Sequence, residues 1–203
     1  MLVLFLLGSL CDFSVQARDF VLVIDAGHGG KDVGARGVKA YEKNITLAVA
    51  RRLGEKVKKE CKDVKVVYTR SDDSFVSLKD RADIANEAHG DLFVSIHVNS
   101  VAKKNKKRRT IAGAEVYTLG LHRSDDNLAV AMRENSVMSL EADHSEVYQG
   151  FDPESSESYI IFELSQSRHM DQSIEMAELV QQSLVSNANR VDKGVKQAGF
   201  WVL

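Results

Sequence analysis

Residues 21–30 of this chain, VLVIDAGHGG, decide its fold and point to its chemistry. The first four are aliphatic, which is typical of a strand buried on both faces of a parallel sheet. The run stops abruptly at His28, which lies between glycines. In open α/β sheets, ligands bind just beyond the carboxyl ends of the strands. We therefore expect a functional site at His28.

A second apolar run ends in the same way, because residues 92–96, LFVSI, are followed by His97. Glu42 lies between the two histidines in sequence, in the first turn of a helix predicted over about residues 41–59. Two imidazoles and one carboxylate suit a catalytic zinc ion, which keeps a fourth position open for water. We predict that His28, Glu42 and His97 bind one zinc ion. Asn99 is expected to contact substrate or orient a ligand.

Other interpretations of the glycine-rich loop fit its residues less well. A phosphate-binding P-loop has Ser or Thr after Gly-Lys, whereas Gly30-Lys31 is followed by Asp32. A dinucleotide-binding loop that began at Gly27 would need glycine in place of Asp32. One isolated histidine is more often structural, but two at successive strand ends beside a carboxylate favour a metal site. The other histidines lack this context: His89, His122, His144 and His169.

Strand and helix patterns alternate along the chain, which predicts an α/β fold: a single domain with a twisted, mostly parallel sheet flanked by helices. Ser77 and Asp80 form a helix-capping pair. Residues 124–184 are mostly helical in pattern, with a polar interruption at 148–156, and residues 199–203 resemble the start of a further strand. Strands are predicted at 20–25, 64–68, 92–98 and 114–119. The helix at 41–59 carries an apolar stripe of Ile45, Val49, Leu53 and Val57.

The composition is that of a globular protein, with 44% hydrophobic residues, 28% charged residues and a net charge of -2. This balance gives no reason to expect nucleic acid as a partner. The basic run at 103–109 lacks interleaved aromatic residues, so we interpret it as a solvated loop. Residues 1–17 are expected to be a signal peptide, since the apolar stretch is too short to span a bilayer and Val15-Gln16-Ala17 resembles a cleavage site.

The motifs together resemble the zinc-dependent N-acetylmuramoyl-L-alanine amidases, namely the cell-separation amidases and their sporulation and phage relatives. The resemblance is close over residues 20–119 and looser to residue 203. It implies zinc bound by His28, Glu42 and His97. It also implies hydrolysis of the amide between N-acetylmuramic acid and L-alanine in peptidoglycan, by a periplasmic or secreted monomer acting in daughter-cell separation. The matching motifs are DAGHGGKD (25–32), EKN (42–44), Thr69-Arg70, Arg81 and SIHVNS (95–100).

The resemblance further implies a general-base glutamate on a late strand, which would follow Leu203. We therefore expect residues 18–203 to be a catalytic domain that lacks its C-terminal end. Within the chain, Glu163 at the end of an apolar run is the alternative base. A second hypothesis is a catalytically impaired fragment that binds zinc and peptidoglycan. A zinc carboxypeptidase is a third, but the ligand spacing and substrate-binding arginines of that family are not evident.

In the cell-separation branch, a helical insertion can block the zinc site until an activator protein displaces it. Residues 134–158 of this chain occupy the corresponding region. A glutamate in this insertion, Glu141 or Glu146, is expected to take the fourth position on zinc. The alternative is a solvated acidic helix on the surface.

Overall fold

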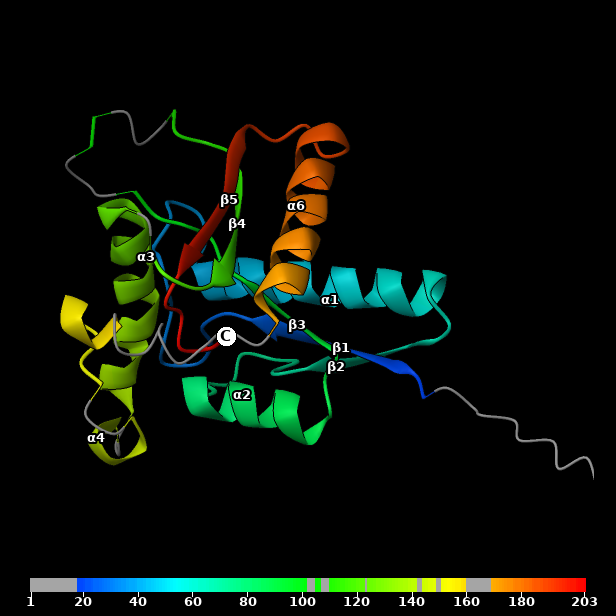
Figure 1. The fold of residues 1–203 in the computed structure, drawn as a ribbon, viewed down its shortest axis with the longest axis horizontal. Helices are drawn as coiled ribbons and strands as arrows, with labels where there is room; N and C mark the ends of the chain where they lie inside the picture. Colours follow the sequence, from blue (N-terminus) through cyan, green and yellow to red (C-terminus); the bar gives the residue numbers. More distant parts are fainter. Residues whose placement is uncertain are drawn as a thin grey trace, which may run out of the picture.

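The computed structural model describes residues 18–101, 105–106, 110–122, 124–141, 144–148, 151–159 and 169–203. The described strands form two parallel sheets with helices packed around them (Figure 1). The larger sheet has the order β2-β1-β3 and contains β1 (Phe20–Ala26), β2 (Val64–Tyr68) and β3 (Leu92–Ile96). The smaller sheet pairs β4 (Ala114–Leu119) with β5 (Asp192–Ala198). The predicted α/β class with parallel strands is confirmed.

Strand β1 lies at the centre of the larger sheet, as its aliphatic sequence predicts. Val23 and Ile24 are fully buried. Leu22 pairs with Val66 on one side and with Leu92 on the other. Because all three strands run in the same direction, their carboxyl ends meet at one edge of the sheet. The loops that follow β1 and β3 are therefore neighbours.

Helix α1 (Glu42–Glu60) connects β1 to β2 within one residue of the predicted bounds. Its second half packs on the sheet through Leu53 and Val57. In its first half the predicted apolar stripe is not buried, since Ile45 and Val49 are 40% and 43% exposed. The buried face of the helix there contacts the loop after β1 through Thr46 and the sheet core through Leu47 and Ala50. Its buried face consequently carries Glu42, Thr46 and Ala50.

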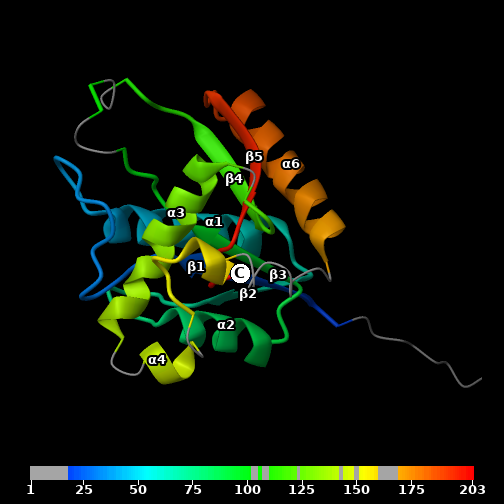
Figure 2. The same ribbon diagram turned by 60° about the vertical axis from the view of Figure 1, so that its left-hand side comes forward.

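The remaining helices surround the strands. Helix α2 (Leu78–Glu87) begins at the predicted cap, where the Ser77 hydroxyl accepts a hydrogen bond from the Asp80 N–H at 3.0 Å. Helix α6 (Met170–Ser186) packs against β4 and β5. The helical segment that follows β4 comprises α3 (Asp125–Asn135), the 3-10 helix η1 (Ser136–Leu140) and α4 (His144–Val147). Figure 2 shows this segment beside the larger sheet.

The strand predicted at residues 199–203 is wrong, because the final strand is β5 and the chain turns after it. Phe200 is buried against the Tyr117 ring, with centroids 5.2 Å apart. The Trp201 N–H donates to Asn135 Oδ1 at 3.0 Å, and its ring packs on Tyr148. These apolar residues therefore anchor the chain to the helical segment. Strand β5 was missed because its sequence, DKGVKQA, is mostly polar.

Some predictions concern residues outside the described ranges. They are the signal peptide at 1–17, most of the basic loop at 103–109, and Glu163. Among the described helices, none combines the length and apolar character needed to cross a membrane.

Candidate metal centre

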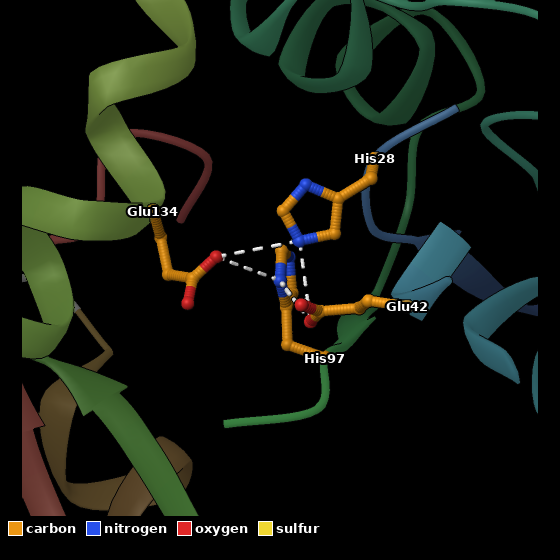
Figure 3. A group of neighbouring side chains, drawn as sticks. All are labelled: His28, Glu42, His97 and Glu134. Carbon is orange, nitrogen blue, oxygen red and sulfur yellow. Dashed lines mark ion pairs between the residues drawn. The ribbon is translucent and has the colours of Figure 1, made fainter. Parts of the chain in front are cut away.

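Four side chains from distant parts of the sequence meet at the carboxyl edge of the larger sheet (Figure 3). His28 follows β1, Glu42 opens α1, His97 follows β3 and Glu134 lies on α3. One ligand atom from each lies within 4.8 Å of the others. Glu42 Oε1 is 3.2 Å from His28 Nε2 and 3.4 Å from His97 Nδ1, while Glu134 Oε2 is 3.5 Å and 3.0 Å from the same nitrogens.

The donor atoms of this cluster fit a zinc ion. The facing nitrogens, His28 Nε2 and His97 Nδ1, are buried, and their contacts with the two carboxylates are ion pairs that lack hydrogen-bond geometry. Such orphaned polar atoms are costly unless something binds them. A tetrahedral zinc ion with bonds of about 2.0–2.1 Å holds its ligand atoms about 3.3 Å apart. The contacts of 3.0–3.5 Å across the cluster suit that geometry.

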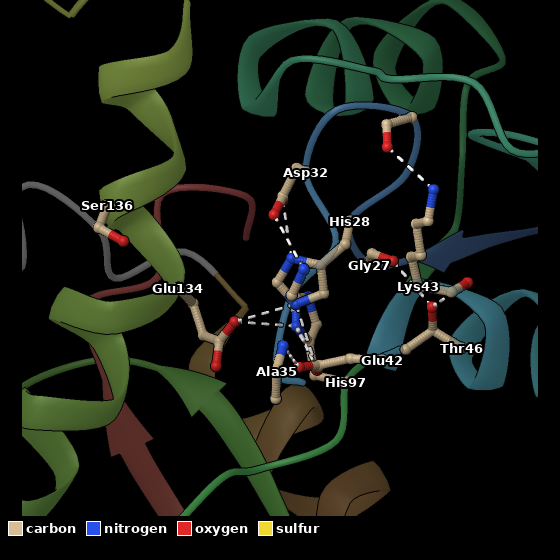
Figure 4. A network of polar contacts seen from close by, with 12 residues as sticks. Gly27, His28, Asp32, Ala35, Glu42, Lys43, Thr46, His97, Glu134 and Ser136 are labelled. Carbon is tan, nitrogen blue, oxygen red and sulfur yellow. Dashed lines mark hydrogen bonds and ion pairs between the residues drawn. The ribbon is translucent and has the colours of Figure 1, made fainter. Parts of the chain in front are cut away.

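The loop after β1 is shaped around the imidazole rings (Figure 4). His28 has a φ of 62°, in the left-handed region that residues other than glycine seldom adopt. Asp32 Oδ2 lies 2.7 Å from His28 Nδ1, which directs Nε2 toward the cluster. A Cβ on Gly27 would lie 2.3 Å from His97 Nε2, and one on Gly34 would lie 2.6 Å from the His28 ring. The glycines thus make room for the histidines themselves.

Glu42 is held as an ionised carboxylate. Its Oε2 accepts a hydrogen bond from the Ala35 N–H at 2.8 Å, and its Oε1 accepts one from the Val98 N–H at 2.5 Å. Burial acts to raise the pKa of this carboxyl, but the contacts with His28 and His97 outweigh burial and hold the pKa well below its usual range. Glu42 is therefore a buried, anionic candidate ligand.

Glu134 supplies the fourth corner of the cluster. It lies within the insertion expected at 134–158, although the sequence did not single it out. Its Oε1 accepts from Arg133 Nη2 at 2.8 Å, and Oε2 faces the two histidines. Burial acts to lower the pKa of His97, but the contacts with Glu134 and Glu42 raise it to about 10. In the metal-free protein, a proton on His97 thus offsets the charge of the carboxylates.

The other predicted site residues lie elsewhere. Glu141 accepts hydrogen bonds from the Leu78 N–H at 3.1 Å and from the Tyr148 hydroxyl at 2.6 Å, so it caps α2. Glu146 is exposed on α4, and the cluster of described residues does not include it. The side-chain oxygen Oδ1 of Asn99 accepts from Arg133 Nη2 at 2.7 Å, and its side-chain NH2 group donates to Glu115.

Residues 22–203 match the family described as N-acetylmuramoyl-L-alanine amidase. This chain belongs to that family. AmiC from Escherichia coli O6:H1 is 32% identical over 193 residues, which are 92% of this chain and 42% of AmiC. The probable amidase AmiB of Haemophilus influenzae is 35% identical over 137 residues, covering 66% of this chain and 30% of AmiB. The chain therefore spans less than half the length of these curated amidases.

Solved amidase structures share the fold. The N-acetylmuramoyl-L-alanine amidase from Clostridium difficile 630 superposes with a TM-score of 0.61 and 28% identity, covering 92% of this chain and 74% of that one. Amidase AmiC2 of Nostoc punctiforme gives a TM-score of 0.57 and 27% identity, with 91% and 72% covered. The arrangement of strands and helices is thus that of the amidase family.

Proposed function

We propose that this chain is the catalytic domain of a zinc-dependent peptidoglycan amidase. It would hydrolyse the amide between N-acetylmuramic acid and L-alanine, with one zinc ion held by His28, Glu42 and His97. The observation that carries this proposal is the pair of buried nitrogens, without hydrogen bonds, that converge on a buried carboxylate. The membership of the amidase family supports the choice of reaction.

The residues of the cluster have separate roles in this chemistry. A bound zinc ion supplies Lewis-acid polarisation of a carbonyl and lowers the pKa of water. Asp32 fixes the tautomer of His28, so that Nε2 presents its lone pair to the cluster. Glu42 would balance part of the metal charge, and two backbone N–H groups hold its oxygens in place.

We further propose that Glu134 closes the fourth position of the zinc site in the resting protein. Its carboxylate lies where a substrate carbonyl or a water molecule would need to enter. Helix α3 would have to move for peptidoglycan to reach the metal. An activator protein that displaces the helical segment containing α3 would then switch on the amidase.

The cellular setting follows from the same proposal. Peptidoglycan lies outside the cytoplasmic membrane, so the domain at 18–203 would act in the periplasm or after secretion, with residues 1–17 removed as a signal peptide. Cell wall remodelling during daughter-cell separation is the proposed role. The 32% identity to AmiC and the 35% identity to AmiB support the amidase activity on which this role depends.

A second candidate is a domain that binds zinc and peptidoglycan without appreciable turnover. Within the described part of the cluster, the carboxylates are Glu42 and Glu134, and both contact the histidines. Neither is free to serve as a general base in this conformation. General-base catalysis typically contributes about 10²–10⁴-fold to a rate.

The proposed function is tested with purified cell-wall sacculi. Zinc-loaded protein, tested together with Glu134→Ala, is expected to release stem peptides that carry a free L-alanine amino group, and His97→Ala to release none. His169→Ala is the matched control, because His169 is exposed and lies outside the cluster. Zinc binding and sacculus binding without peptide release, in parent and Glu134→Ala alike, would favour the second candidate.

A further inference from the structure

Two buried arginines converge on the loop that carries His28. Arg70 follows β2 and Arg81 lies on α2, and each is only 3% exposed. Asp25, fully buried at the end of β1, accepts from Arg81 Nη1 at 2.5 Å and from the Thr69 and Ser95 hydroxyls. We call Arg70 and Arg81 the arginine pair.

The arginine pair binds three successive backbone carbonyls. The oxygen of Ala26 accepts from Arg70 Nε at 2.8 Å and from Arg81 Nη1 at 2.9 Å. Arg70 Nη2 donates to the Gly27 oxygen at 2.9 Å, and Arg81 Nη2 donates to the His28 oxygen at 2.8 Å. The backbone is therefore fixed on both sides of the peptide bond that joins Gly27 to His28.

Arg70 also connects this loop to α1. Its Nη2 donates to the Lys43 carbonyl at 2.9 Å and to the Thr46 hydroxyl at 3.2 Å. Lys43 adjoins the candidate ligand Glu42 in the first turn of the helix. One guanidinium group thus spans the backbones that carry two of the three candidate ligands.

Stability alone gives a weak reason for this arrangement. Burying a guanidinium group is costly, and replacing a buried ion pair with apolar residues is often neutral or stabilising. Among the described residues, the ion pairs of the arginine pair reduce to Arg81 with Asp25. Even with Asp25 paired to Arg81, the arginine pair leaves a positive charge beside the zinc site, which opposes metal binding. The arginine pair then acts through the conformation that it imposes on the loop. His28, with a φ of 62°, is the strained residue of that loop that needs support.

We propose that Arg70 and Arg81 are positioning residues that raise the zinc affinity by holding residues 26–28 in the conformation that aims His28 at the cluster. The inference rests on the proposed zinc site but does not depend on the reaction. Arg81 acts on His28 through its carbonyl, and Arg70 keeps the loop in register with Glu42. The guanidinium forks bind several carbonyls at once, which a lysine cannot do.

A positioning role and a purely electrostatic effect of the arginines predict opposite changes in zinc affinity when Arg81 is replaced by Met. Zinc affinity is measured by competition with a chromogenic chelator for the parent, Arg81→Met, Arg81→Lys and Arg70→Lys. Removal of a cation alone would tighten zinc binding in Arg81→Met. A positioning role predicts that Arg81→Met weakens zinc binding about 10–100-fold. Both lysine variants keep the charge and are expected to weaken binding too, because one ammonium cannot replace the fork.

A spectrum and two controls separate positioning from general destabilisation. Cobalt-loaded Arg81→Lys is expected to show shifted visible absorption bands, which report the ligand geometry. Val66→Ala in β2 loosens the core without touching the loop, and Arg52→Met removes an exposed charge of α1. Both controls are expected to bind zinc as the parent does.

The zinc affinity and the folding of the arginine variants decide whether the positioning role holds. Folded arginine variants that bind zinc as tightly as the parent, or more tightly, would overturn the inference. Failure of even the lysine variants to fold would also overturn it, because the pair would then be holding the fold. A parent chain that binds no zinc would instead refute the proposed function.

Discussion

Glu134 Oε2 lies 3.0 Å from His97 Nδ1, so a helix distant in sequence supplies the fourth side of the histidine–carboxylate cluster. Glu134 is itself held by Arg133, whose guanidinium also donates to the side-chain oxygen Oδ1 of Asn99 at 2.7 Å. The residues just after β3 and the end of α3 are thereby linked twice. The closed site therefore depends on the contacts of both Arg133 and Glu134 with the residues just after β3, and not on Glu134 alone.

The first prediction concerns the closure of the site. Glu134→Ala removes a charge-assisted contact worth about 1.5–3 kcal/mol. If Glu134 blocks the zinc, the open population and the release of stem peptides from sacculi should rise roughly 10–100-fold. Exposed Glu146→Ala is the control and should leave the rate unchanged. Lost activity with an unchanged zinc content would show that Glu134 instead assists the reaction.

The second prediction concerns the residue that orients His28. Asp32 accepts from His28 Nδ1 and also from the Gly34 N–H at 3.1 Å. Asp32→Ala should lower zinc affinity about 10–100-fold, because the imidazole loses its fixed tautomer and orientation. Chelator competition measures the effect, with exposed Asp63→Asn as the control. Equal affinities for Asp32→Ala and the parent would contradict the assigned role.

The third prediction concerns acid stability. Burial acts to raise the pKa of Asp25, but Arg81 and the hydroxyls of Ser95 and Thr69 lower it below its usual range. A carboxyl with a lowered pKa stabilises the fold above its unfolded value, about 3.9, and that contribution disappears as the pH falls toward the folded value. The metal-free chain should therefore lose urea resistance below about pH 4.

The variant Asp25→Asn tests this source of acid sensitivity. It should lose about 3–5 kcal/mol of unfolding free energy at neutral pH, because Arg81 is left buried without its carboxylate. The difference from the parent should shrink as the pH falls below 4. A difference that stays constant across the acid range would contradict the prediction.

The fourth prediction concerns Glu141, which caps α2 and lies outside the zinc cluster. Glu141→Gln should leave zinc affinity unchanged. It should lower the unfolding free energy by about 1 kcal/mol, since a charge at a helix N-terminus is lost. Chelator competition and urea titration measure the two effects. Weaker zinc binding by this variant would mean that Glu141 contributes to the metal site.

The meeting of His28, Glu42 and His97 could be predicted because local rules decide it. Aliphatic runs placed two strands side by side, and parallel strands end at the same edge. A glutamate in the first turn of the connecting helix points back to that edge. Their role as zinc ligands stays a prediction.

Glu134 could not be singled out because its position depends on tertiary packing. It follows an arginine near the end of an ordinary amphipathic helix, and nothing in the spacing shows which side of α3 faces the cluster. Tertiary contacts set that orientation, since Ala131 of α3 packs in the core beside Phe200 and Arg133 contacts Asn99. The roles of Arg70 and Arg81 were equally hidden, because their partners are backbone carbonyls, which carry no sequence signal.

The most direct test of the zinc site is crystallographic. Crystals of zinc-loaded protein, measured on both sides of the zinc absorption edge, locate the metal by anomalous scattering. The proposed zinc site predicts one peak, about 2.0–2.2 Å from His28 Nε2, His97 Nδ1 and an oxygen of Glu42. Crystals that bind no zinc there, or bind it only at other residues, would contradict it.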